Sequence, residues 1–483
     1  MDYDRLSGRV LDTASARGAQ YADVRFEVAR AERIEVRNGV ISTLSDASSG
    51  GYGVRALVDG AWGFAAESQP SDASADRVAA LAVEIARAGA AVGRRRFAQP
   101  PARAYNDTFA TPFAIDPATI PLERRVELLL QAENALHAAP EIGVGRAWID
   151  VWQTEKRFYS TIGSKIAQTI RQAGSGVQAT AIGEGDVQSR TFPGDVGLYR
   201  SGGWEVVESA QLRENARRIG EEAAALLHAP QCPSGSFDLI LGGSQMSLQL
   251  HESCGHPAEL DRVMGWEASF SGVSFLSIEQ LDKLRYGSDL VTIVIDNTHP
   301  SGLATVGYDD EGTKSTRSEI VRNGMLTGYE MSNDTARAIG RESNACVRAQ
   351  SWEFVPMIRM CNLHLLPGNV PFEHLFDDVR DGIYMESNRS WSIDDHRLNF
   401  QFGCEIGWEI KNGKRGRMLK NPTYAGMTPR FWNACDAIAD EHSWNSWGTP
   451  NCGKGEPMQT GRTAQGASPA RFRGIDVGVA YRA

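Results

Sequence analysis

The first 65 residues alternate apolar and polar positions in short runs that are interrupted by tight-turn dipeptides. Asn38-Gly39 and Asp59-Gly60 each separate two such runs. Asn-Gly and Asp-Gly readily take the positive φ angles that a two-residue β-hairpin turn requires. The pattern therefore predicts two β-hairpins near the start of the chain, over residues 34–43 and 53–65.

Three later segments repeat their apolar residues every three or four positions, which is the spacing of one face of an α-helix. They predict helices near Ala75–Ala88, Leu122–His137 and Glu205–Leu227. Pro121 suits the first turn of the second helix, where a missing N–H breaks no hydrogen bond. Strand-like pieces from Ala147 to Gln178 lie between the second and third helices. The first half of the chain is therefore expected to be mixed α+β.

The segment 229–236 differs in composition from the residues around it. It contains two prolines, two serines and a glycine, which is typical of an exposed linker. Strand patterns dominate beyond it, at Phe237–Leu241, Leu290–Ile295 and Asn399–Ile410, with hairpin turns at Asn323-Gly324 and Asn412-Gly413.

A chain of 483 residues is long for a single core. We therefore predict an α+β protein with two domains. The N-terminal α+β domain, with hairpins and amphipathic helices, spans residues 1–228. The linker 229–236 follows, and then a mostly β C-terminal domain, residues 237–483, that carries the helix of a metal site.

Composition narrows the class of protein without identifying a function. Hydrophobic residues make up 42% of the chain and charged residues 23%, which is ordinary for a globular protein. The net charge of -10 argues against a nucleic-acid-binding protein, which usually has a basic face. No apolar stretch approaches the ~20 residues needed to span a bilayer, and the N-terminus lacks a secretory signal pattern. We expect a cytoplasmic protein with neither a nucleic-acid nor a membrane partner.

The segment 251–256, His-Glu-Ser-Cys-Gly-His, is the richest in candidate chemistry. Imidazole nitrogens are good zinc ligands, and a neighbouring carboxylate can take a proton from metal-bound water. His251 and His256 are therefore candidate metal ligands, and Glu252 is a candidate general base. The alternative is a chance cluster in which Glu252 is an ordinary solvated helix residue.

The separation of the two histidines constrains the local backbone. Five steps of an α-helix rotate by roughly 500°, which leaves the second histidine about 140° from the face of the first. Both can reach one metal only if the helix is widened, as in a π-bulge, or ends between them. Gly255 is a poor helix former, and Pro257 disfavours helical dihedrals at His256. The pattern therefore predicts a helix that breaks at His256.

A catalytic zinc site usually has about three protein ligands, so the 7 cysteines are candidates for the third. None belongs to a CxxC pair, which disfavours a zinc ribbon and fits a reducing compartment. Cys452 stands out because Gly453 lets the backbone approach closely and Lys454 would help to hold a thiolate. Small buried apolar roles are expected for Cys346, Cys361, Cys404 and Cys435.

These segments together resemble the TldD branch of the TldD/PmbA family, from about residue 20 to the end of the chain. Their order and spacing are far more specific than the hexapeptide alone. The segments that carry the resemblance are Arg37-Asn38-Gly39, Gly51-Tyr52-Gly53-Val54-Arg55, Gly60-Ala61-Trp62-Gly63-Phe64-Ala65, residues 251–256, Asp309-Asp310-Glu311-Gly312-Thr313 and Cys452-Gly453-Lys454.

The resemblance implies a zinc metallopeptidase that acts on extended peptides, with Zn²⁺ ligands His251, His256 and Cys452 and a catalytic Glu252. It also implies a dimer whose active site faces an enclosed lumen. That dimer is either a homodimer or a heterodimer with a TldE/PmbA-like subunit, which lacks the metal motif. Two alternatives stay open: a non-catalytic peptide-binding partner subunit, and a zinc amidohydrolase that acts on a non-peptide amide.

Three further features have weaker signals. Glu259 has a counterpart in the family and is expected to orient a ligand histidine, the alternative being an exposed acid. Asp309-Asp310-Glu311 lacks the alternation of a calcium loop, and the resemblance makes it a candidate wall of the active site. Cys254 is a rival soft ligand, and we predict that it points away from the metal because it lies on a different side of the turn from Glu252.

Overall fold

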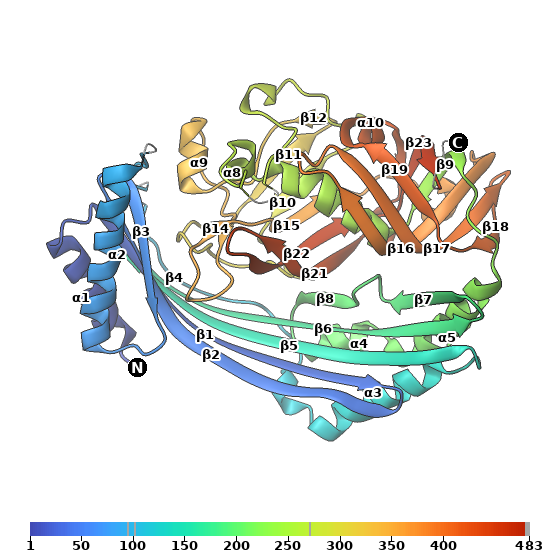
Figure 1. Ribbon diagram of the computed structural model, residues 1–483, viewed down its shortest axis with the longest axis horizontal. Helices are drawn as coiled ribbons and strands as arrows, with labels where there is room; N and C mark the ends of the chain where they lie inside the picture. The colour runs from blue at the N-terminus through green and yellow to red at the C-terminus, as the bar shows by residue number, and fades with distance from the viewer. Residues whose placement is uncertain (94–95, 101–102, 270–271, 479–483) are drawn as a thin grey trace.

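A long, curved sheet forms the framework of the N-terminal half in the computed structural model, which describes residues 1–93, 96–100, 103–269 and 272–478 (Figure 1). Its strands are β1 (Tyr21–Arg37), β2 (Val40–Val58), β3 (Ala61–Glu67), β4 (Asn106–Ala110), β5 (Ile142–Ser160), β6 (Lys165–Gly183), β7 (Asp186–Phe192) and β8 (Leu198–Ser201). The order is β3-β2-β1-β5-β6-β4, and β7 and β8 also pair with β6.

Both predicted N-terminal hairpins are confirmed. β1 and β2 pair directly across Asn38-Gly39, and β2 and β3 pair across Asp59-Gly60. The φ angles are 48° and 76° at the first turn, and 47° and 76° at the second. Each dipeptide therefore takes the two positive φ angles that favour these residue types in a tight hairpin.

Helices cover the sheet in two groups (Figure 1). They are α1 (Tyr3–Ala16) and α2 (Asp72–Val92), which pack on β1–β3, and α3 (Leu122–Leu136), α4 (Trp204–Ser209) and α5 (Leu212–His228), which pack against β5 and β6. The predicted helices 75–88 and 122–137 are confirmed. A single helix over 205–227 is wrong, because Gln211 has a left-handed φ of 48° that separates α4 from α5. No described helix is both long and apolar enough to cross a bilayer.

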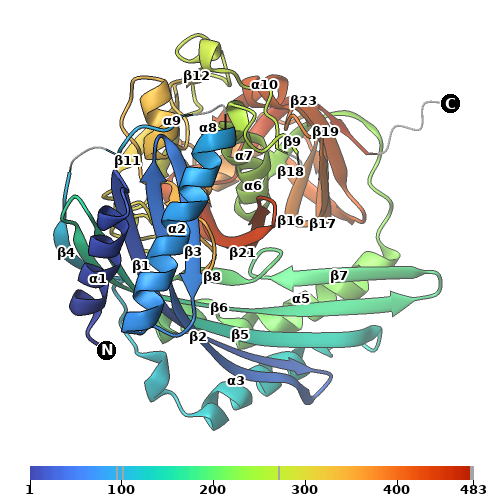
Figure 2. The ribbon, with the colours of Figure 1, turned by 60° about the vertical axis from the view of Figure 1, so that its left-hand side comes forward.

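The described part of the C-terminal half forms three smaller sheets above the concave side of the long sheet (Figures 1 and 2). Their strands are β9 (Gly235–Leu241), β10 (Ile293–Asp296), β11 (Arg317–Arg322), β12 (Met325–Leu326), β13 (Val347–Arg348), β14 (Met357–Ile358), β15 (Asn362–Leu365), β16 (Asp381–Ile393), β17 (Asn399–Lys411), β18 (Lys414–Leu419), β19 (Thr423–Met427), β20 (Cys435–Ile438), β21 (Asn445–Lys454), β22 (Gln459–Ala467) and β23 (Ala470–Val477).

Two of these sheets enclose the helix that carries the candidate ligands. One has the order β12-β11-β10-β15-β22-β21 and the other β16-β9-β23-β19-β17-β18, with β20 beside β23; β13 and β14 form the small third sheet. The helices are α6 (Gly243–Leu250), α7 (His256–Ala258), α8 (Leu260–Val263), α9 (Asn333–Ala338) and α10 (Thr428–Asn433). The predicted hairpins at Asn323-Gly324 and Asn412-Gly413 and the predicted α+β class are confirmed.

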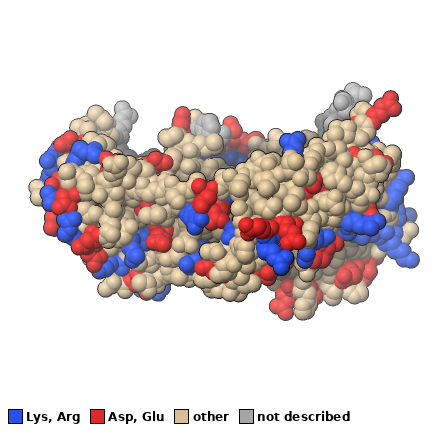
Figure 3. Space-filling view, turned by 90° about the horizontal axis from the view of Figure 1, so that it is seen from below, with Lys and Arg blue, Asp and Glu red and all other residues tan. Residues whose placement is uncertain are grey.

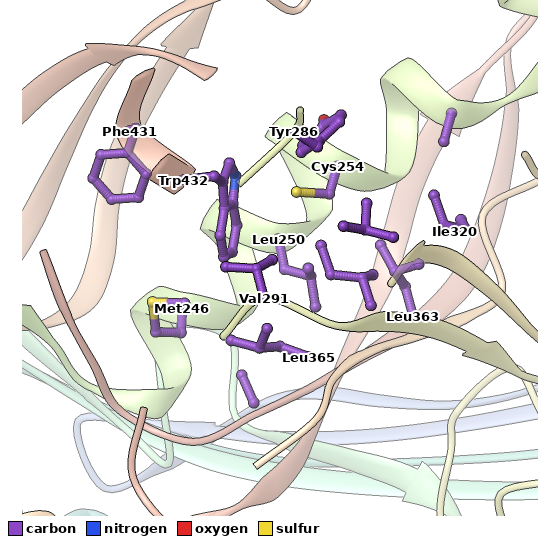
Figure 4. Packing of buried hydrophobic residues seen from close by; sticks show 14 of the residues in the cluster. Met246, Leu250, Cys254, Tyr286, Val291, Ile320, Leu363, Leu365, Phe431 and Trp432 are labelled. Carbon is purple, nitrogen blue, oxygen red and sulfur yellow. The ribbon is translucent and has the colours of Figure 1, made fainter. Parts of the chain in front are cut away.

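The largest hydrophobic cluster surrounds α6 (Figure 4). Met246, Leu250 and Cys254 extend from this helix and its continuation into a core that includes Trp432 and Leu363. Burying so much apolar surface around one helix fixes its rotation. The same packing therefore fixes the direction in which the opposite face of the helix presents its polar residues.

Residues 229–236 run from α5 into the C-terminal half. Most of them are exposed, but the Cys232 side chain is only 5% exposed and packs in the C-terminal core. The last two residues of the segment already belong to β9, which pairs with β23 and β16. We propose on this basis that residues 1–228 and 237–483 are two domains, each with hydrophobic clusters of its own.

Acidic and basic side chains intermingle both outside and inside the molecule. Figure 3 shows both signs of charge dispersed over the face that is seen from below. Between the halves, the ammonium of Lys156 on β5 lies 3.0 Å from both carboxylate oxygens of Asp310. Arg190 on β7 donates to Glu405 on β17 at 2.9 Å. Buried ion pairs therefore tie the long sheet to the C-terminal half.

Candidate metal centre

The 251–256 segment lies on a helix that is locally widened. α6 follows β9 and continues as a π-helical turn over His251–Gly255, in which the N–H of His256 donates to the carbonyl of His251. This bond between residues five apart is the pattern of a π-bulge. The helix continues through α7 and ends at Glu259, where ψ is 112°. The widening is one of the two arrangements that the spacing allows. The predicted break at His256 is wrong, because Pro257 lies in the first turn of α7, where its missing N–H is tolerated.

His251, His256 and Cys452 converge on one point. Their candidate ligand atoms all lie within 4.8 Å of one another. The sulfur of Cys452, on β21, is 3.6 Å from Nε2 of His256, and the two imidazole centroids are 4.8 Å apart. Each of the three residues is at most 5% exposed. The widened helix and a strand of the six-stranded sheet thus bring together residues that are 196 positions apart.

The donor set fits a zinc ion. Imidazole nitrogen and thiolate sulfur together are typical ligands of zinc. The Nδ1 atom of His251 is buried and has no hydrogen-bond partner among the described residues. Buried polar atoms are nearly always satisfied in native proteins, so this ring has a binding capacity that the protein itself does not use.

His251 and Cys452 stabilise each other's charged forms. Burial lowers the pKa of His251, but the neighbouring Cys452 thiolate outweighs this effect and raises the pKa to about 9. Burial raises the pKa of Cys452, but the charges of His256 and His251 hold it well below its usual range. Thiolate is the form of cysteine that binds metals. The sulfur is therefore poised to bind a cation.

Glu252 is adjacent to the first candidate ligand and is held by an arginine. Its side chain is buried, and Oε2 accepts a hydrogen bond of 2.9 Å from Nη1 of Arg397. A charge-assisted hydrogen bond of this length fixes both partners more firmly than a neutral one. The carboxylate is therefore restrained through one oxygen, which leaves the second oxygen for other interactions.

Arg397 lies on the turn between β16 and β17 in an uncommon backbone conformation. Its φ is 61°, in the left-handed region that non-glycine residues rarely adopt. The Thr428 hydroxyl donates to the Arg397 carbonyl at 3.0 Å, and the Asp394 carboxylate accepts from the N–H of Leu398 at 2.8 Å. Arg397 could not be predicted from the sequence, because no motif marks it and 145 positions separate it from Glu252.

A buried network lies behind the second histidine. Oε2 of Glu259 is 3.2 Å from Nδ1 of His256, so that Nε2 faces Cys452, which agrees with the expected orienting role. The prediction that Lys454 holds the thiolate of Cys452 is wrong. Its ammonium donates to both carboxylate oxygens of Asp261 at 2.8 Å and lies 3.5 Å from Glu259. Two buried carboxylates require this cation more strongly than the sulfur does.

Cys254 and the 309–311 segment lie outside the triad. Cys254 points into the hydrophobic cluster towards Tyr286 (Figure 4), and burial raises the pKa of its thiol well above the usual range. Asp310 contacts Lys156 of the long sheet, and Glu311 pairs with Arg55 at 3.2 Å. The segment 309–311 therefore connects the two halves of the molecule.

The N-terminal half contributes a carboxyl group that sequence analysis missed. Asp195 lies on the loop between β7 and β8. Burial raises its pKa to about 6, against the opposing effects of a hydrogen bond with Asn388 and the charge of His251. An acid from the long sheet is therefore within electrostatic reach of a candidate ligand. The sequence carries no spacing pattern that would connect the two.

Three models of one protein family match consecutive parts of the chain. PmbA/TldA metallopeptidase domain 1 matches residues 22–86, the central domain matches 115–229, and the C-terminal domain matches 234–478. The C-terminal match alone spans half of the chain. It contains His251, His256 and Cys452, together with Glu252 and Arg397.

Relatives and a solved structure match the chain over nearly its whole length. A metalloprotease from Methanothermobacter thermautotrophicus is 26% identical over 99% of both chains. A metalloprotease TldD homolog from Haemophilus influenzae is 26% identical over 92% of this chain and 90% of its own. The crystal structure of TldE from Thermococcus kodakarensis has a TM-score of 0.73 and 14% identity, covering 98% of this chain and 100% of that one, which shows a shared fold. The chain belongs to the TldD/PmbA family of metallopeptidases.

Proposed function

We propose that this protein is a zinc-dependent peptidase that hydrolyses unfolded or short extended peptides. The observation that carries the proposal is the convergence of His251, His256 and Cys452 beside a buried Glu252. Buried, well-oriented nitrogen and sulfur donors next to a carboxylate have the composition of a hydrolytic zinc site. Membership of a metallopeptidase family supports the same reaction class.

Glu252 is the general base in this proposal. Zinc, when bound, supplies a Lewis acid that lowers the pKa of water and polarises a peptide carbonyl. Glu252 accepts the proton of the attacking water and passes it to the leaving amine. Arg397, at 2.9 Å, keeps the carboxylate in one orientation while the proton moves. Glu259 restrains the ring of His256 in the same way from behind.

An extended substrate suits the architecture. β3 is the last strand of the long sheet and pairs only with Tyr52–Val58 of β2, so residues 40–51 of β2 form a free edge beside it in the described chain. A free edge can accept a peptide through main-chain hydrogen bonds, which are insensitive to side chains. We therefore propose modest side-chain specificity.

The proposed functional unit is a cytoplasmic dimer, formed by two copies or by one copy and a TldE/PmbA-like subunit. The fold shared with TldE supports such a pairing, because two chains of one shape can form equivalent interfaces. Purification at native expression, followed by identification of any bound second chain, distinguishes the homodimer from the heterodimer.

Two alternative functions use the same architecture. One is a non-catalytic peptide-binding subunit, and the other is a zinc amidohydrolase for a non-peptide amide. The position of Glu252 next to a candidate metal ligand favours a catalyst over a binding subunit, because a purely structural metal site needs no neighbouring base. A screen of peptides and small amides as substrates distinguishes the peptidase from the amidohydrolase.

The deciding experiment combines zinc analysis with turnover of unfolded peptides and small amides. Glu252→Gln is expected to keep its zinc while peptide turnover falls by ~10²–10⁴-fold, since positioned acid–base catalysis contributes about that much. Glu409→Gln, which removes a carboxylate near the surface, serves as the control and should retain activity. Near-wild-type turnover by Glu252→Gln contradicts the proposal. A protein that turns over neither peptides nor small amides, with or without bound zinc, is the binding subunit, and turnover of small amides alone identifies the amidohydrolase.

A further inference from the structure

A cavity lies between the concave face of the long sheet and the β21–β22 hairpin. Its volume is about 270 Å³, and none of the three candidate metal ligands lines it. Four cationic side chains and one carboxylate do so, namely Lys156, Arg348, Arg359, Arg462 and Glu27. Lys156 pairs with Asp310, so three guanidinium groups and the single carboxylate of Glu27 leave the lining with an excess of positive charge.

None of these three arginines forms an ion pair with a carboxylate in the described part of the chain, although Glu27 and Asp150 act on Arg462 from a greater distance. Arg348 donates to the backbone carbonyls of Arg462 and Met360, and Arg359 donates to those of Gln459 and Cys452. Arg462 donates to the side-chain carbonyl of Gln172 and lies over the ring of Trp152. The Nε atoms of Arg348 and Arg359 are buried and unsatisfied.

Two other buried arginines of this protein form ion pairs with carboxylates. Arg55 pairs with Asp23 at 2.6 Å, and Arg190 pairs with Glu405 at 2.9 Å. Burial, together with the nearby charge of Arg348, lowers the pKa of Arg462 to about 10, although the carboxylates of Glu27 and Asp150 oppose this shift. A buried charge without a counter-ion is strongly unfavourable, so the cluster indicates an anion that the chain itself does not supply.

We propose that this cavity binds a carboxylate group of the peptide substrate, an inference that rests on the proposed peptidase function. Guanidinium groups hold the two oxygens of a carboxylate through paired hydrogen bonds. The shared chemistry covers two sources, the C-terminal carboxylate of a peptide and an acidic side chain within it. Glu27 in the same wall disfavours anions with several charges.

The position of the cavity suits a substrate anchor. Arg359 donates to the carbonyl of Cys452, and Gly461, which pairs with Cys452 in the hairpin, lines the cavity. One guanidinium therefore contacts both the cavity and the backbone of a candidate metal ligand. The cavity therefore adjoins the strand that carries Cys452, one of the candidate metal ligands.

The test measures peptide binding by calorimetry in the zinc-loaded Glu252→Gln protein, in which turnover is expected to be slow enough for binding to be measured. The probes are acetyl-pentaalanine with a free C-terminal carboxylate, the same peptide as its C-terminal amide, and that amide with one internal glutamate. We expect the free acid, or the amide that contains glutamate, to bind about tenfold or more tightly than the plain amide. The probe that gains affinity identifies the source of the carboxylate.

Two further substitutions in that protein locate the effect. In Arg462→Gln, the ratio of affinities between the carboxylate-bearing peptide and the plain amide should fall to nearly one. Arg462→Lys should keep part of this preference. Arg171→Gln is the matched control, because Arg171 precedes Gln172 on β6, so its side chain points to the opposite face, and lies over Phe113. This variant should keep the full preference.

A second readout does not require a peptide. Sodium acetate at high concentration should raise the melting temperature of the parent protein more than that of Arg462→Gln. Equal affinity for all three peptides, or a preference that survives Arg462→Gln, overturns the inference. Selective binding by a wild-type protein that cleaves no peptide retains the site and refutes the peptidase. If acid and amide peptides are cleaved equally and also bind equally, the peptidase function stands and the carboxylate site is refuted.

Discussion

Two cations, Arg397 and Lys454, neutralise buried carboxylates close to the candidate metal ligands. Arg397 restrains Glu252 from the β16–β17 turn, and Lys454 lies between Asp261 and Glu259. Neither cation contacts the imidazole rings in the described structure. We therefore expect the two residues to affect different properties, Arg397 the rate of the reaction and Lys454 the stability of the site.

Removing the guanidinium of Arg397 tests the first role. Arg397→Ala is expected to lower kcat by about 10–100-fold with zinc content unchanged, because groups that orient a reacting side chain typically contribute that much. Arg397→Lys should recover part of the loss. Arg417→Ala, which removes an exposed ion pair with Glu409, is the control. Steady-state kinetics with parallel zinc analysis measures the effect, and zinc lost together with activity would contradict it.

Removing the ammonium of Lys454 tests the second role. Lys454→Met should destabilise the protein by about 3–5 kcal/mol, because it leaves Asp261 and Glu259 buried without their cation. Lys411→Met breaks an exposed pair with Asp381 and should have little effect. Urea unfolding compares the two. A loss for Lys454→Met no greater than that for Lys411→Met would show that the network does not require the charge.

A functional residue can be predicted from the sequence when the residues next to it form a recognisable motif. The placement of His251, His256 and Cys452 could be anticipated because two of them share a hexapeptide and the third is flanked by glycine. Arg397 and Asp195 could not, because their roles arise from a turn and a loop that tertiary structure brings to the site. Long-range pairing leaves no local pattern.

Helices and strands can be predicted from the sequence where the residues of a tight turn determine their ends. The Asn-Gly and Asp-Gly hairpins formed as predicted, since their positive φ angles depend on those residues alone. The π-helical turn shows the opposite case, because spacing permitted either a widened helix or a broken one. Packing against the buried cluster around α6 favours continuity of the helix through Pro257.

Gly255 is the residue of this turn that admits a quantitative test. Glycine to alanine in a helix usually stabilises by about 0.5–1 kcal/mol. Here a Cβ atom would overlap the side chain of Met360, which is fully buried. Gly255→Ala is therefore expected to destabilise the protein by about 1–3 kcal/mol. In a Met360→Ala background, Gly255→Ala should lower the free energy of unfolding by less. A double-mutant cycle measures this difference, and equal losses in both backgrounds would exclude the overlap as the cause.

The whole molecule is two sets of sheets tied together by buried charges. The long sheet supplies Lys156, Arg25 and Arg190, and the C-terminal half supplies Asp310 and Glu405. The carboxylate cavity and the Asp195 loop lie along the same boundary. Alternation and turn signals predicted the sheets on each side, but the boundary depends on which polar side chains meet, and only the assembled structure defines it.

Asp310 makes the strength of this boundary depend on pH. Burial raises the pKa of Asp310, but Lys156 and Arg25 outweigh that effect and lower it to about 2. A carboxyl group with a lowered pKa in the folded state contributes stability above its unfolded pKa near 4, and this contribution is lost as the pH falls through about 2. A shift of this size corresponds to roughly 2 kcal/mol.

Asp310→Asn should therefore be less stable than wild type above pH 4, and the gap in unfolding free energy should narrow as the pH falls from 4 towards 2. Urea unfolding at a series of pH values measures the gap. Glu409→Gln is the control, because its surface ion pair should give a small gap with little pH dependence. An ion pair must weaken as its carboxylate takes up a proton. A difference in unfolding free energy that stays constant down to pH 2 would therefore mean that Asp310 holds the halves together by packing and neutral hydrogen bonds and not by its charge.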